Sequence, residues 1–386
     1  MADEIKYFIL IICVLLIPKF LLRLRIPAGI TAIALGILTS HFLGWFSSSP
    51  TLEVLATLGV TSLFLFAGLE IDLYELKKDA PTLIKHVVIS VVIIFVCAYG
   101  LHWALDLNYR VATILSLGLT TPSTGFILNS ISGFKLTEQQ KYWIRSKAIA
   151  KEVLALVILF FSLQSESIGQ LSISLGVIVM MILVLPLAFQ FFIKIIAPYA
   201  PDSEVTFMIL MAFICGVVTM KLGAYYLIGA FIAGVIAAQF RHFIKTDDSE
   251  KMLYSISFFA GLLIPFYFFK AGVKIDLSAV SINSLLYGLW FLAIFVPIRY
   301  LNVFVSLRFF LNECWGSRYQ ISLSLMPTLI FGLVIASILR NQFMVDMDII
   351  NGLILYTIVA SIIPSIFLKG APRELYDPRF VAKRRS

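Results

Sequence analysis

The segment AGLEIDL (residues 67–73) returns later in the chain as AGVKIDL (residues 271–277). Five of the seven positions are identical, and each copy closes a long apolar run. An odd number of the membrane crossings predicted below separates the two copies, which places them on opposite sides of a bilayer. The pattern predicts an inverted repeat, a feature of secondary transporters. Chance similarity between two amphipathic helix ends is the alternative interpretation.

The composition predicts an integral membrane protein. Hydrophobic residues make up 60% of the chain, charged residues 13%, and the mean hydropathy is +0.97. Soluble domains average about 25% charged residues. The apolar runs are long and continuous, so we expect an all-α protein rather than a β-barrel. About thirteen transmembrane helices are predicted, near 5–22, 28–46, 52–69, 83–104, 110–131, 142–163, 168–196, 204–221, 223–240, 253–273, 281–308, 316–339 and 348–368.

The basic residues predict the orientation in a cell (inner or plasma) membrane. They gather at alternate loops, as the positive-inside rule requires. This places the N-terminus outside and the basic tail, residues 369–386, in the cytoplasm. It also accounts for the net charge of +8 without nucleic acid as a partner. The loop residues counted as cytoplasmic are Lys19, Arg23, Arg25, Lys77, Lys78, Lys85, Lys135, Lys141, Arg145, Lys147, Arg241, Lys245 and Lys251.

Two predicted helices carry an internal proline among hydroxyl side chains. They are LTTPSTG (residues 119–125) and SLSLMPT (residues 322–328), and their prolines lie one residue from the spacing of the repeat. Proline removes a backbone donor and frees a carbonyl, which a membrane helix tolerates where the opened backbone lines a cavity. We expect two crossed discontinuous helices with oxygen ligands for a small cation, although each proline alone could mark a simple kink. The residues concerned are Thr120, Thr121, Pro122, Ser123, Thr124, Ser324, Pro327 and Thr328.

A pair of opposite charges, Lys151 and Glu152, lies in the apolar stretch AIAKEVLALVILF (residues 148–160). A charge at bilayer depth costs roughly 3 to more than 10 kcal/mol, so it survives mainly beside a partner or a water-filled path. This pair is the leading candidate for function. By contrast, His86 and His102 are predicted to be interfacial, and Lys270 and Lys274 are expected to reach the membrane surface.

Other classes of function find little support in the sequence. The four cysteines are scattered without metal-ligand spacing or a disulfide pattern, and we interpret them as buried small hydrophobic residues. No nucleotide-binding loop, metal motif or catalytic triad is evident, so an enzyme is not expected, and neither is a cofactor. The N-terminal residues lack the basic region of a signal peptide, so the first apolar run is expected to remain as a span.

Several motifs together resemble the second branch of the monovalent cation:proton antiporters, which includes the Kef-type and NapA-type exchangers. FLFAGLEIDL (residues 64–73) resembles a signature of that family, GAFIAG (residues 229–234) resembles another, and residues 26–44 resemble the proline and glycine pattern of its second span. The resemblance runs from about residue 8 to 368. It implies an NhaA- or NapA-like fold and a homodimer. The core helices would lie near residues 52–163 and 253–368 of a transmembrane domain spanning residues 1–368.

The resemblance also implies roles for particular residues. Glu152 falls where the family has its essential carboxylate, and Lys151 replaces an acidic or amide residue. Arg299, in FVPIRY (residues 295–300), aligns with a basic residue of a later core helix and is expected to compensate the charge of the carboxylate. Kef proteins also carry a cytosolic nucleotide-binding domain, for which this sequence offers no counterpart, so gating by such a domain is not expected.

The expected function is electroneutral exchange of Na⁺ or K⁺ for H⁺, because one carboxylate occupies the motif. Lys151 is the difficulty, since a positive charge 4 Å from a bound cation costs about 4 kcal/mol at an effective dielectric of 20. Lys151 could face another direction, lose its proton, or indicate that no free cation is bound. Two alternatives therefore remain open. One is a proton-coupled, anion or organic-solute carrier that uses Lys151 and Arg299, and the other is a transport-inactive sensor with a permanent Lys151–Glu152 salt bridge.

Overall fold

The computed structural model describes residues 3–71, 77, 79–131, 133–165, 167–200, 203–223, 226–240 and 246–369, and these residues form an almost wholly helical protein. The chain divides into two compact units, each built from segments distant in sequence. Unit 1 comprises Met1–Ser48, Asp79–Leu159 and Phe268–Arg373; unit 2 comprises Ser49–Lys78, Phe160–Tyr267 and Glu374–Ser386. Asp72 and nearly all of the predicted tail, 370–386, lie outside the described residues.

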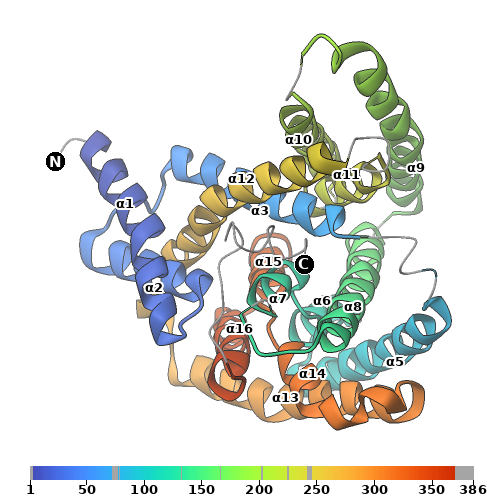
Figure 1. Ribbon diagram of the computed structural model, residues 1–386. Coiled ribbons are helices and arrows are strands. Elements are labelled where there is room, and N and C mark those ends of the chain that lie inside the picture. The colour runs from blue at the N-terminus through green and yellow to red at the C-terminus, as the bar shows by residue number, and fades with distance from the viewer. Residues whose placement is uncertain are drawn as a thin grey trace. The chain divides into compact units, whose positions relative to one another are not determined.

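Unit 1 contains the two proline-interrupted segments. Within it α5 packs on α6, α6 on α15, and α15 on α16, while α16 also lies along α13 (Figure 1). The helices of this unit are α1 (Asp3–Leu21), α2 (Ala28–Leu43), α5 (Ala80–Leu105), α6 (Tyr109–Thr120), α7 (Thr124–Ile131), α8 (Glu138–Gln164), α13 (Ile282–Phe310), α14 (Arg318–Ser324), α15 (Leu329–Gln342) and α16 (Met347–Phe367), of which α8 ends in unit 2.

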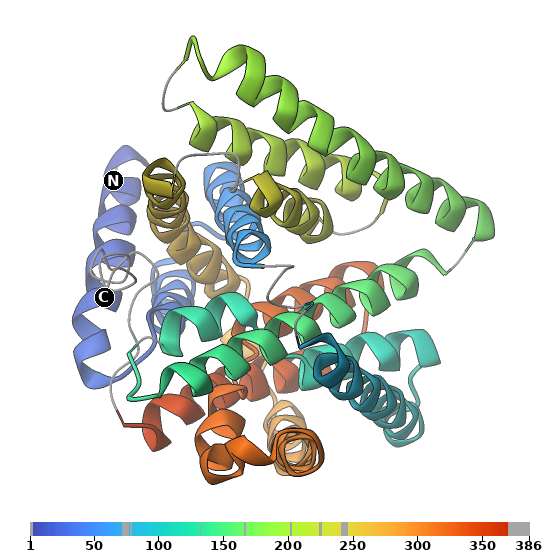
Figure 2. The same ribbon diagram turned by 45° about the vertical axis from the view of Figure 1, so that its right-hand side comes forward.

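Unit 2 is a smaller helical packet in which α11 packs against α3, α10 and α9 (Figure 2). Its helices are α3 (Pro50–Leu69), α9 (Ile168–Phe191), α10 (Glu204–Lys221), α11 (Tyr226–Phe240) and most of α12 (Thr246–Val273). Short helical turns follow several helices: η1 (Leu22–Leu24), η2 (Phe192–Ile196), η4 (Leu277–Ala279) and η5 (Asn312–Ser317).

Each of the thirteen predicted segments coincides with a described helix or an interrupted pair of helices. Nine described helices are long and apolar enough to cross a membrane, or ten with the bent α14–α15 pair. The expected count of thirteen spans is therefore met only in part. Two of the remaining segments, α2 and the apolar part of α11, are too short, and α8 carries many charged residues.

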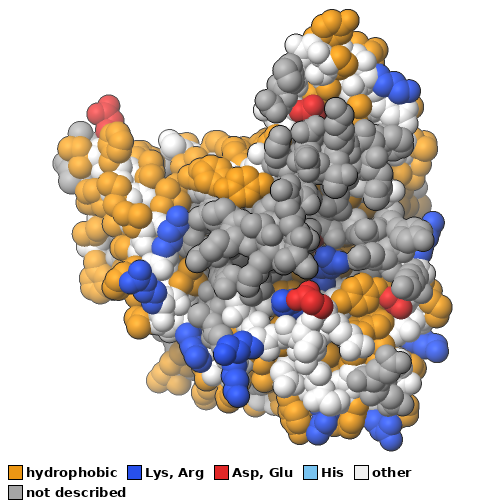
Figure 3. All heavy atoms as spheres, in the orientation of Figure 1, with side chains coloured by type: hydrophobic (Ala, Val, Ile, Leu, Met, Phe, Trp, Pro, Cys, Tyr) orange, Lys and Arg blue, Asp and Glu red, His pale blue; other side chains and the backbone are white. Residues whose placement is uncertain are grey.

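The outer face of α1 shows why these helices belong in a bilayer. Phe8, Ile12, Leu16 and Phe20 recur every four residues and are largely exposed. Figure 3 shows hydrophobic side chains gathered on the left of the view, where α1 lies in Figure 1. Exposed apolar side chains at this spacing present one continuous stripe, which lipid covers favourably.

The glycines of the repeated motif permit close packing of backbones. A Cβ on Gly68 of α3 would lie 2.5 Å from the carbonyl oxygen of Phe231 in α11. A Cβ on Gly272 of α12 would lie 2.1 Å from the carbonyl oxygen of Ile33 in α2. Small residues allow membrane helices to approach this closely. Both copies of the motif therefore use their glycine in the same way, each against a helix from the other half of the sequence.

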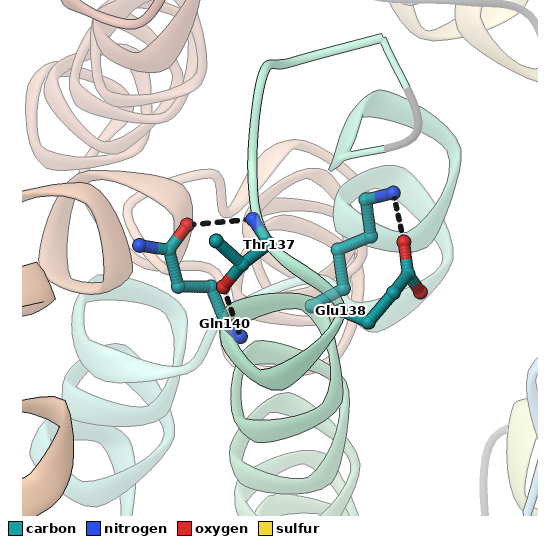
Figure 4. A network of polar contacts seen from close by, with 4 residues as sticks. Thr137, Glu138 and Gln140 are labelled. Atoms are coloured by element: carbon teal, nitrogen blue, oxygen red, sulfur yellow. Dashed lines mark hydrogen bonds and ion pairs between the residues drawn. The ribbon is translucent and has the colours of Figure 1, made fainter.

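The start of α8 is defined by a reciprocal capping box (Figure 4). The Thr137 backbone N–H donates to Gln140 Oε1 at 2.9 Å, and the Gln140 N–H donates to Thr137 Oγ1 at 3.2 Å. Glu138 and Lys141 form an exposed ion pair at 2.7 Å in the same turn. Such a box satisfies backbone donors that a helix end leaves open. It places the polar end of α8 well before its buried charged residues.

Candidate functional site

The two interrupted segments meet at their prolines. The first break separates α6 from α7, and the second separates α14 from α15 with a bend of 43°. The Ser123 backbone N–H donates to the carbonyl oxygen of Pro327 at 2.9 Å. Ser123 Oγ also accepts from the backbone N–H groups of Ile330 and Phe331, at 3.0 and 2.9 Å. Ser123 of the first break thus caps the helix that follows the second break, in the manner of an N-cap hydroxyl.

Glu152 belongs to α8, and its carboxylate lies at the N-terminal end of α7. Its Oε2 accepts a hydrogen bond of 3.0 Å from the Thr124 backbone N–H, and its side chain is only 3% exposed. The N-terminal end of a helix carries a partial positive charge that stabilises an anion. A buried carboxylate is therefore placed where a half-helix favours its ionised form, and it remains close to the hydroxyl groups of the breaks.

Lys151, the neighbour of Glu152 in the sequence, is also buried, with 6% exposure. No ion pair within 4.0 Å joins Lys151 to Glu152 among the described residues. Adjacent helical residues point about 100° apart, whereas residues four apart share a face. Lys147 shares the face of Lys151, and its Nζ donates to Ser306 Oγ of α13 at 2.9 Å. This geometry agrees with the interpretation that Lys151 faces away from the carboxylate.

Arg299 belongs to α13, and its guanidinium group lies at the C-terminal end of α14. It is 3% exposed, and its Nη2 donates to the Leu325 carbonyl oxygen at 2.6 Å. Its Nη1 donates to Tyr356 Oη at 3.2 Å, and the Tyr356 hydroxyl donates to the Leu119 carbonyl oxygen at 2.6 Å. A guanidinium therefore meets the negative end of α14, and a phenol meets the negative end of α6. In the described structure the direct partners of Arg299 are this carbonyl and Tyr356.

Several buried hydroxyl groups at the breaks lack a hydrogen-bond partner within the described structure. They include Thr121 Oγ1 and Thr124 Oγ1, which belong to predicted cation ligands, and Ser324 Oγ and Thr328 Oγ1 of the second predicted break. Thr120 differs, because its hydroxyl donates to the Ser116 carbonyl of the same helix at 2.7 Å. Buried polar atoms are nearly always bonded, so unpaired oxygen atoms indicate a place for an ion or water. The donor set of a carboxylate with neutral oxygens suits a small hard cation.

The sequence did not reveal three buried partners that the tertiary structure brings together. His86 was expected at the interface, but it is buried, and its Nδ1 lies 2.8 Å from Ser306 Oγ. Lys147 was counted as a loop residue, but it lies about 13 Å into α8 at 1.5 Å per residue. Tyr356 carries no pattern that marks it. The four-residue spacing from Lys147 to Lys151 was the available signal. His102, in contrast, is half-buried near the end of α5 and stacks on Tyr109.

The described residues contain no cluster of three or more histidine, cysteine or acidic side chains that could hold a resident metal ion. Cys97, Cys215 and Cys314 are buried free thiols, and Cys13 is partly buried. The burial of three of these thiols agrees with the interpretation of the cysteines as small hydrophobic residues. The chemistry available at the breaks is that of one carboxylate, fixed dipoles and hydroxyl groups.

Comparisons with known proteins agree with this arrangement. The family described as "Sodium/hydrogen exchanger, transmembrane" matches residues 8–371. The "Probable Na(+)/H(+) antiporter 3" of Methanocaldococcus jannaschii is 23% identical over 94% of this chain and 95% of its own length. The "Na(+)/H(+)-K(+) antiporter GerN" of Bacillus cereus is 22% identical over 79% of this chain and 80% of its own. The solved structure of the sodium proton antiporter MjNhaP1 from M. jannaschii has a TM-score of 0.69 at 17% identity, with 98% of each chain covered.

The family match covers nearly the whole chain, and the likeness to MjNhaP1 extends the agreement to the fold. These similarities include relatives from more than one branch of the antiporters, so they identify the family without its branch. The chain is a multi-pass membrane transporter and not an enzyme. It belongs to the sodium/hydrogen exchanger family.

Proposed function

We propose that this protein exchanges Na⁺ or K⁺ for H⁺, one for one, with Glu152 binding either the cation or the proton. The observation that carries this proposal is the position of the buried Glu152 carboxylate at the first N–H of α7. A carboxylate can hold a proton or a metal ion but not both at once. Alternate loading of one group would then couple the two fluxes.

The unpartnered hydroxyl groups supply the remaining cation ligands. Thr121, Ser324 and Thr328 belong to the two breaks, and their oxygen atoms are buried without hydrogen bonds. A cation that replaces the proton on Glu152 would gain these neutral oxygens as well. Ser123 and Thr124 contribute by setting the backbone of the crossing, through the bonds from Ser123 to α15 and from the Thr124 N–H to Glu152.

The positive side chains support cation binding only if they stay out of its first coordination shell. Lys151 has no ion pair with Glu152, and its face of α8 is the one from which Lys147 reaches Ser306. Arg299 donates hydrogen bonds to Tyr356 Oη and to the Leu325 carbonyl oxygen. The permanent charge of Arg299 would compensate the ionised carboxylate without occupying the ion site.

The scaffold proposed for this exchange is an inverted repeat with two crossed discontinuous helices. The equivalent packing of Gly68 and Gly272 supports the repeat, and the Ser123–Pro327 bond supports the crossing. We further propose a homodimer of the second antiporter branch, with core helices near 52–163 and 253–368. The N-terminus would lie outside, and the basic tail, residues 369–386, would face anionic lipid in the cytoplasm.

Proteoliposomes with an enclosed pH-sensitive dye provide the test. Under an imposed pH gradient, Na⁺, K⁺ or Li⁺ should collapse the gradient. Na⁺ and K⁺ are tested first, because the relatives are named as antiporters of these ions. Glu152→Gln retains an oxygen that can accept from Thr124 but cannot carry a proton, so exchange should fall to the level of empty vesicles. Glu138→Gln removes an exposed carboxylate of the same helix and should leave the rate unchanged. Exchange retained by Glu152→Gln would end this proposal.

A second candidate is an anion or organic-solute carrier, favoured by one observation. Lys147, Lys151 and Arg299 are buried in the described structure, whereas Glu152 is its only buried carboxylate. Under this reading no alkali cation collapses the gradient, and a screen of anionic solutes in the same vesicles finds the substrate. A sensor without transport would show neither flux.

A further inference from the structure

A second buried polar cluster, which the proposed exchange does not use, joins three helices of unit 1. Lys147 of α8 is 1% exposed, and His86 of α5 and Ser306 of α13 are also buried. Lys147 Nζ donates to Ser306 Oγ at 2.9 Å, and His86 Nδ1 lies 2.8 Å from the same oxygen. The distance from Lys147 Nζ to His86 Nδ1 is 3.4 Å. The three polar groups therefore contact one another directly.

The hydrogen-bonding capacity of these groups determines where the protons lie. An ammonium group only donates, so Ser306 Oγ accepts from Lys147 and its own proton is free to reach His86 Nδ1. His86 is then neutral, with its remaining proton on Nε2. Two basic groups this close in a buried site cannot both be charged without a large like-charge penalty. The cluster thus holds one exchangeable positive charge.

Among the residues that the structure describes, no carboxylate pairs with the cluster. Lys147 makes no ion pair with an acidic side chain in the described part of the chain. The other charged or titratable groups that face it or its neighbour Lys151 are Arg299 of α13, Cys97 of α5 and Cys314 of η5. Within the described residues, therefore, no salt bridge fixes the charge of the cluster.

A polar side chain lies between this cluster and the breaks. Asn302 sits on α13 between Arg299 and Ser306, at spacings of three and four residues that place all three on one helix face. It is buried, and neither of its amide atoms has a hydrogen-bond partner in the described structure. On α8, Lys147 and Glu152 are five residues apart, about 7.5 Å along the axis. The cluster is thus near enough to influence the carboxylate through its charge.

We propose that Lys147, Ser306 and His86 form a proton-binding site separate from Glu152, and that its occupancy sets the pH range in which the carrier binds its cation. This inference rests on the function proposed for Glu152. A proton on the cluster adds positive charge near the carboxylate and weakens cation binding. Its loss at higher pH removes that charge and strengthens binding.

The first test compares cation affinity in proteoliposomes between about pH 6 and pH 9, the range over which the cluster is proposed to lose its proton. Lys147→Gln removes the charge permanently, so at the acidic end its KM for Na⁺ or K⁺ should fall roughly tenfold toward the alkaline value. Its maximal rate at the alkaline end should match that of the unaltered protein. Ser90→Ala is the matched control, because Ser90 is a buried serine one turn from His86 that bonds only the His86 carbonyl. An unchanged KM–pH profile in Lys147→Gln would overturn the inference.

The second test does not depend on transport. Nitrogen-15 histidine NMR of the full chain in lipid nanodiscs should show His86 neutral with its proton on Nε2, and Nδ1 shifts that follow pH. The His86→Gln spectrum assigns these signals, and Ser306→Ala should abolish the pH response, whereas Ser306→Thr should keep it. A proton on Nδ1, or signals unaffected by pH, would refute the site. That outcome, together with loss of exchange in Glu152→Gln, would leave the proposed exchange intact.

Discussion

The starts of α7 and α15 satisfy the same electrostatic need in different ways. Each is a half-helix beginning inside the protein with unpaired backbone donors. At α7 the acceptor is the carboxylate of Glu152. At α15 the acceptors are two hydroxyl groups, Ser123 Oγ for Ile330 and Phe331, and Ser361 Oγ for Thr328. One half-helix is capped by a group that can change charge, and the other by groups that remain neutral.

The C-terminal ends of α6 and α14, which precede the two breaks, also differ in whether the group that pairs with them is charged. The last carbonyls of α14 face a permanently charged guanidinium, Arg299, whereas Leu119 at the end of α6 faces the neutral hydroxyl of Tyr356. The only acidic side chain at the crossing of the described structure is Glu152. In the described structure, neutral or permanently charged groups pair with three of the four helix ends at the crossing, and Glu152 is the one group there whose charge can change.

The largest effect in this comparison is expected from Ser123→Ala. Two buried N–H groups of α15 lose their acceptor, and loss of an N-cap hydroxyl costs about 1 kcal/mol for each. We expect about 2 kcal/mol lower stability, measured as chemical unfolding of the purified protein in detergent. Ser361→Ala frees one N–H and is the graded control. Equal effects of the two variants would contradict the assigned role of Ser123.

A smaller effect is expected from Tyr356→Phe. This change removes the hydroxyl that accepts from Arg299 and donates to the Leu119 carbonyl. Hydrogen bonds between membrane helices are worth about 0.6 kcal/mol on average, so the loss should be about 1 kcal/mol in the same unfolding assay. The transport rate should decline at all cation concentrations, because Arg299 loses its support. A normal rate with unchanged stability would show that the Tyr356 bridge is dispensable.

The smallest change in stability is expected from Thr121→Val. The Thr121 hydroxyl is buried without a partner, and an apolar group of the same shape should be nearly neutral for folding, within about 0.5 kcal/mol. If its oxygen binds the cation, the KM of exchange should rise several-fold. Thr120→Val is the matched control, since the Thr120 hydroxyl is already bonded to Ser116. An equal KM in both variants would remove Thr121 from the ion site.

Much of the fold was predictable because apolar length and proline position act locally. The interrupted segments were located from Pro122 and Pro327, and the structure has breaks at both. Glu152 was singled out as an acidic residue in an apolar run, and it is buried beside a break. Each of these features follows from the cost of exposing a charge or an unpaired backbone group to lipid.

The partners of the polar residues were not predictable, because they come from distant helices. His86, Lys147 and Ser306 lie far apart in the sequence, and the positive-inside count assigned Lys147 to a loop. Tyr356 lies in an apolar helix with no neighbouring motif. Of the thirteen predicted spans, nine or ten are long and apolar enough by themselves among the described helices, since hydropathy does not distinguish a short helix such as α2 from one that crosses the membrane unaided.

The sequence by itself determined that this chain enters a membrane, repeats a glycine motif, interrupts two helices and buries one carboxylate. These properties depend on composition and on spacing along one helix. Only the tertiary structure decided that Ser123 caps α15, that Arg299 donates to the end of α14, and that Lys147 contacts Ser306. Such pairings depend on which helices pack together, and packing brings together residues that no local pattern connects.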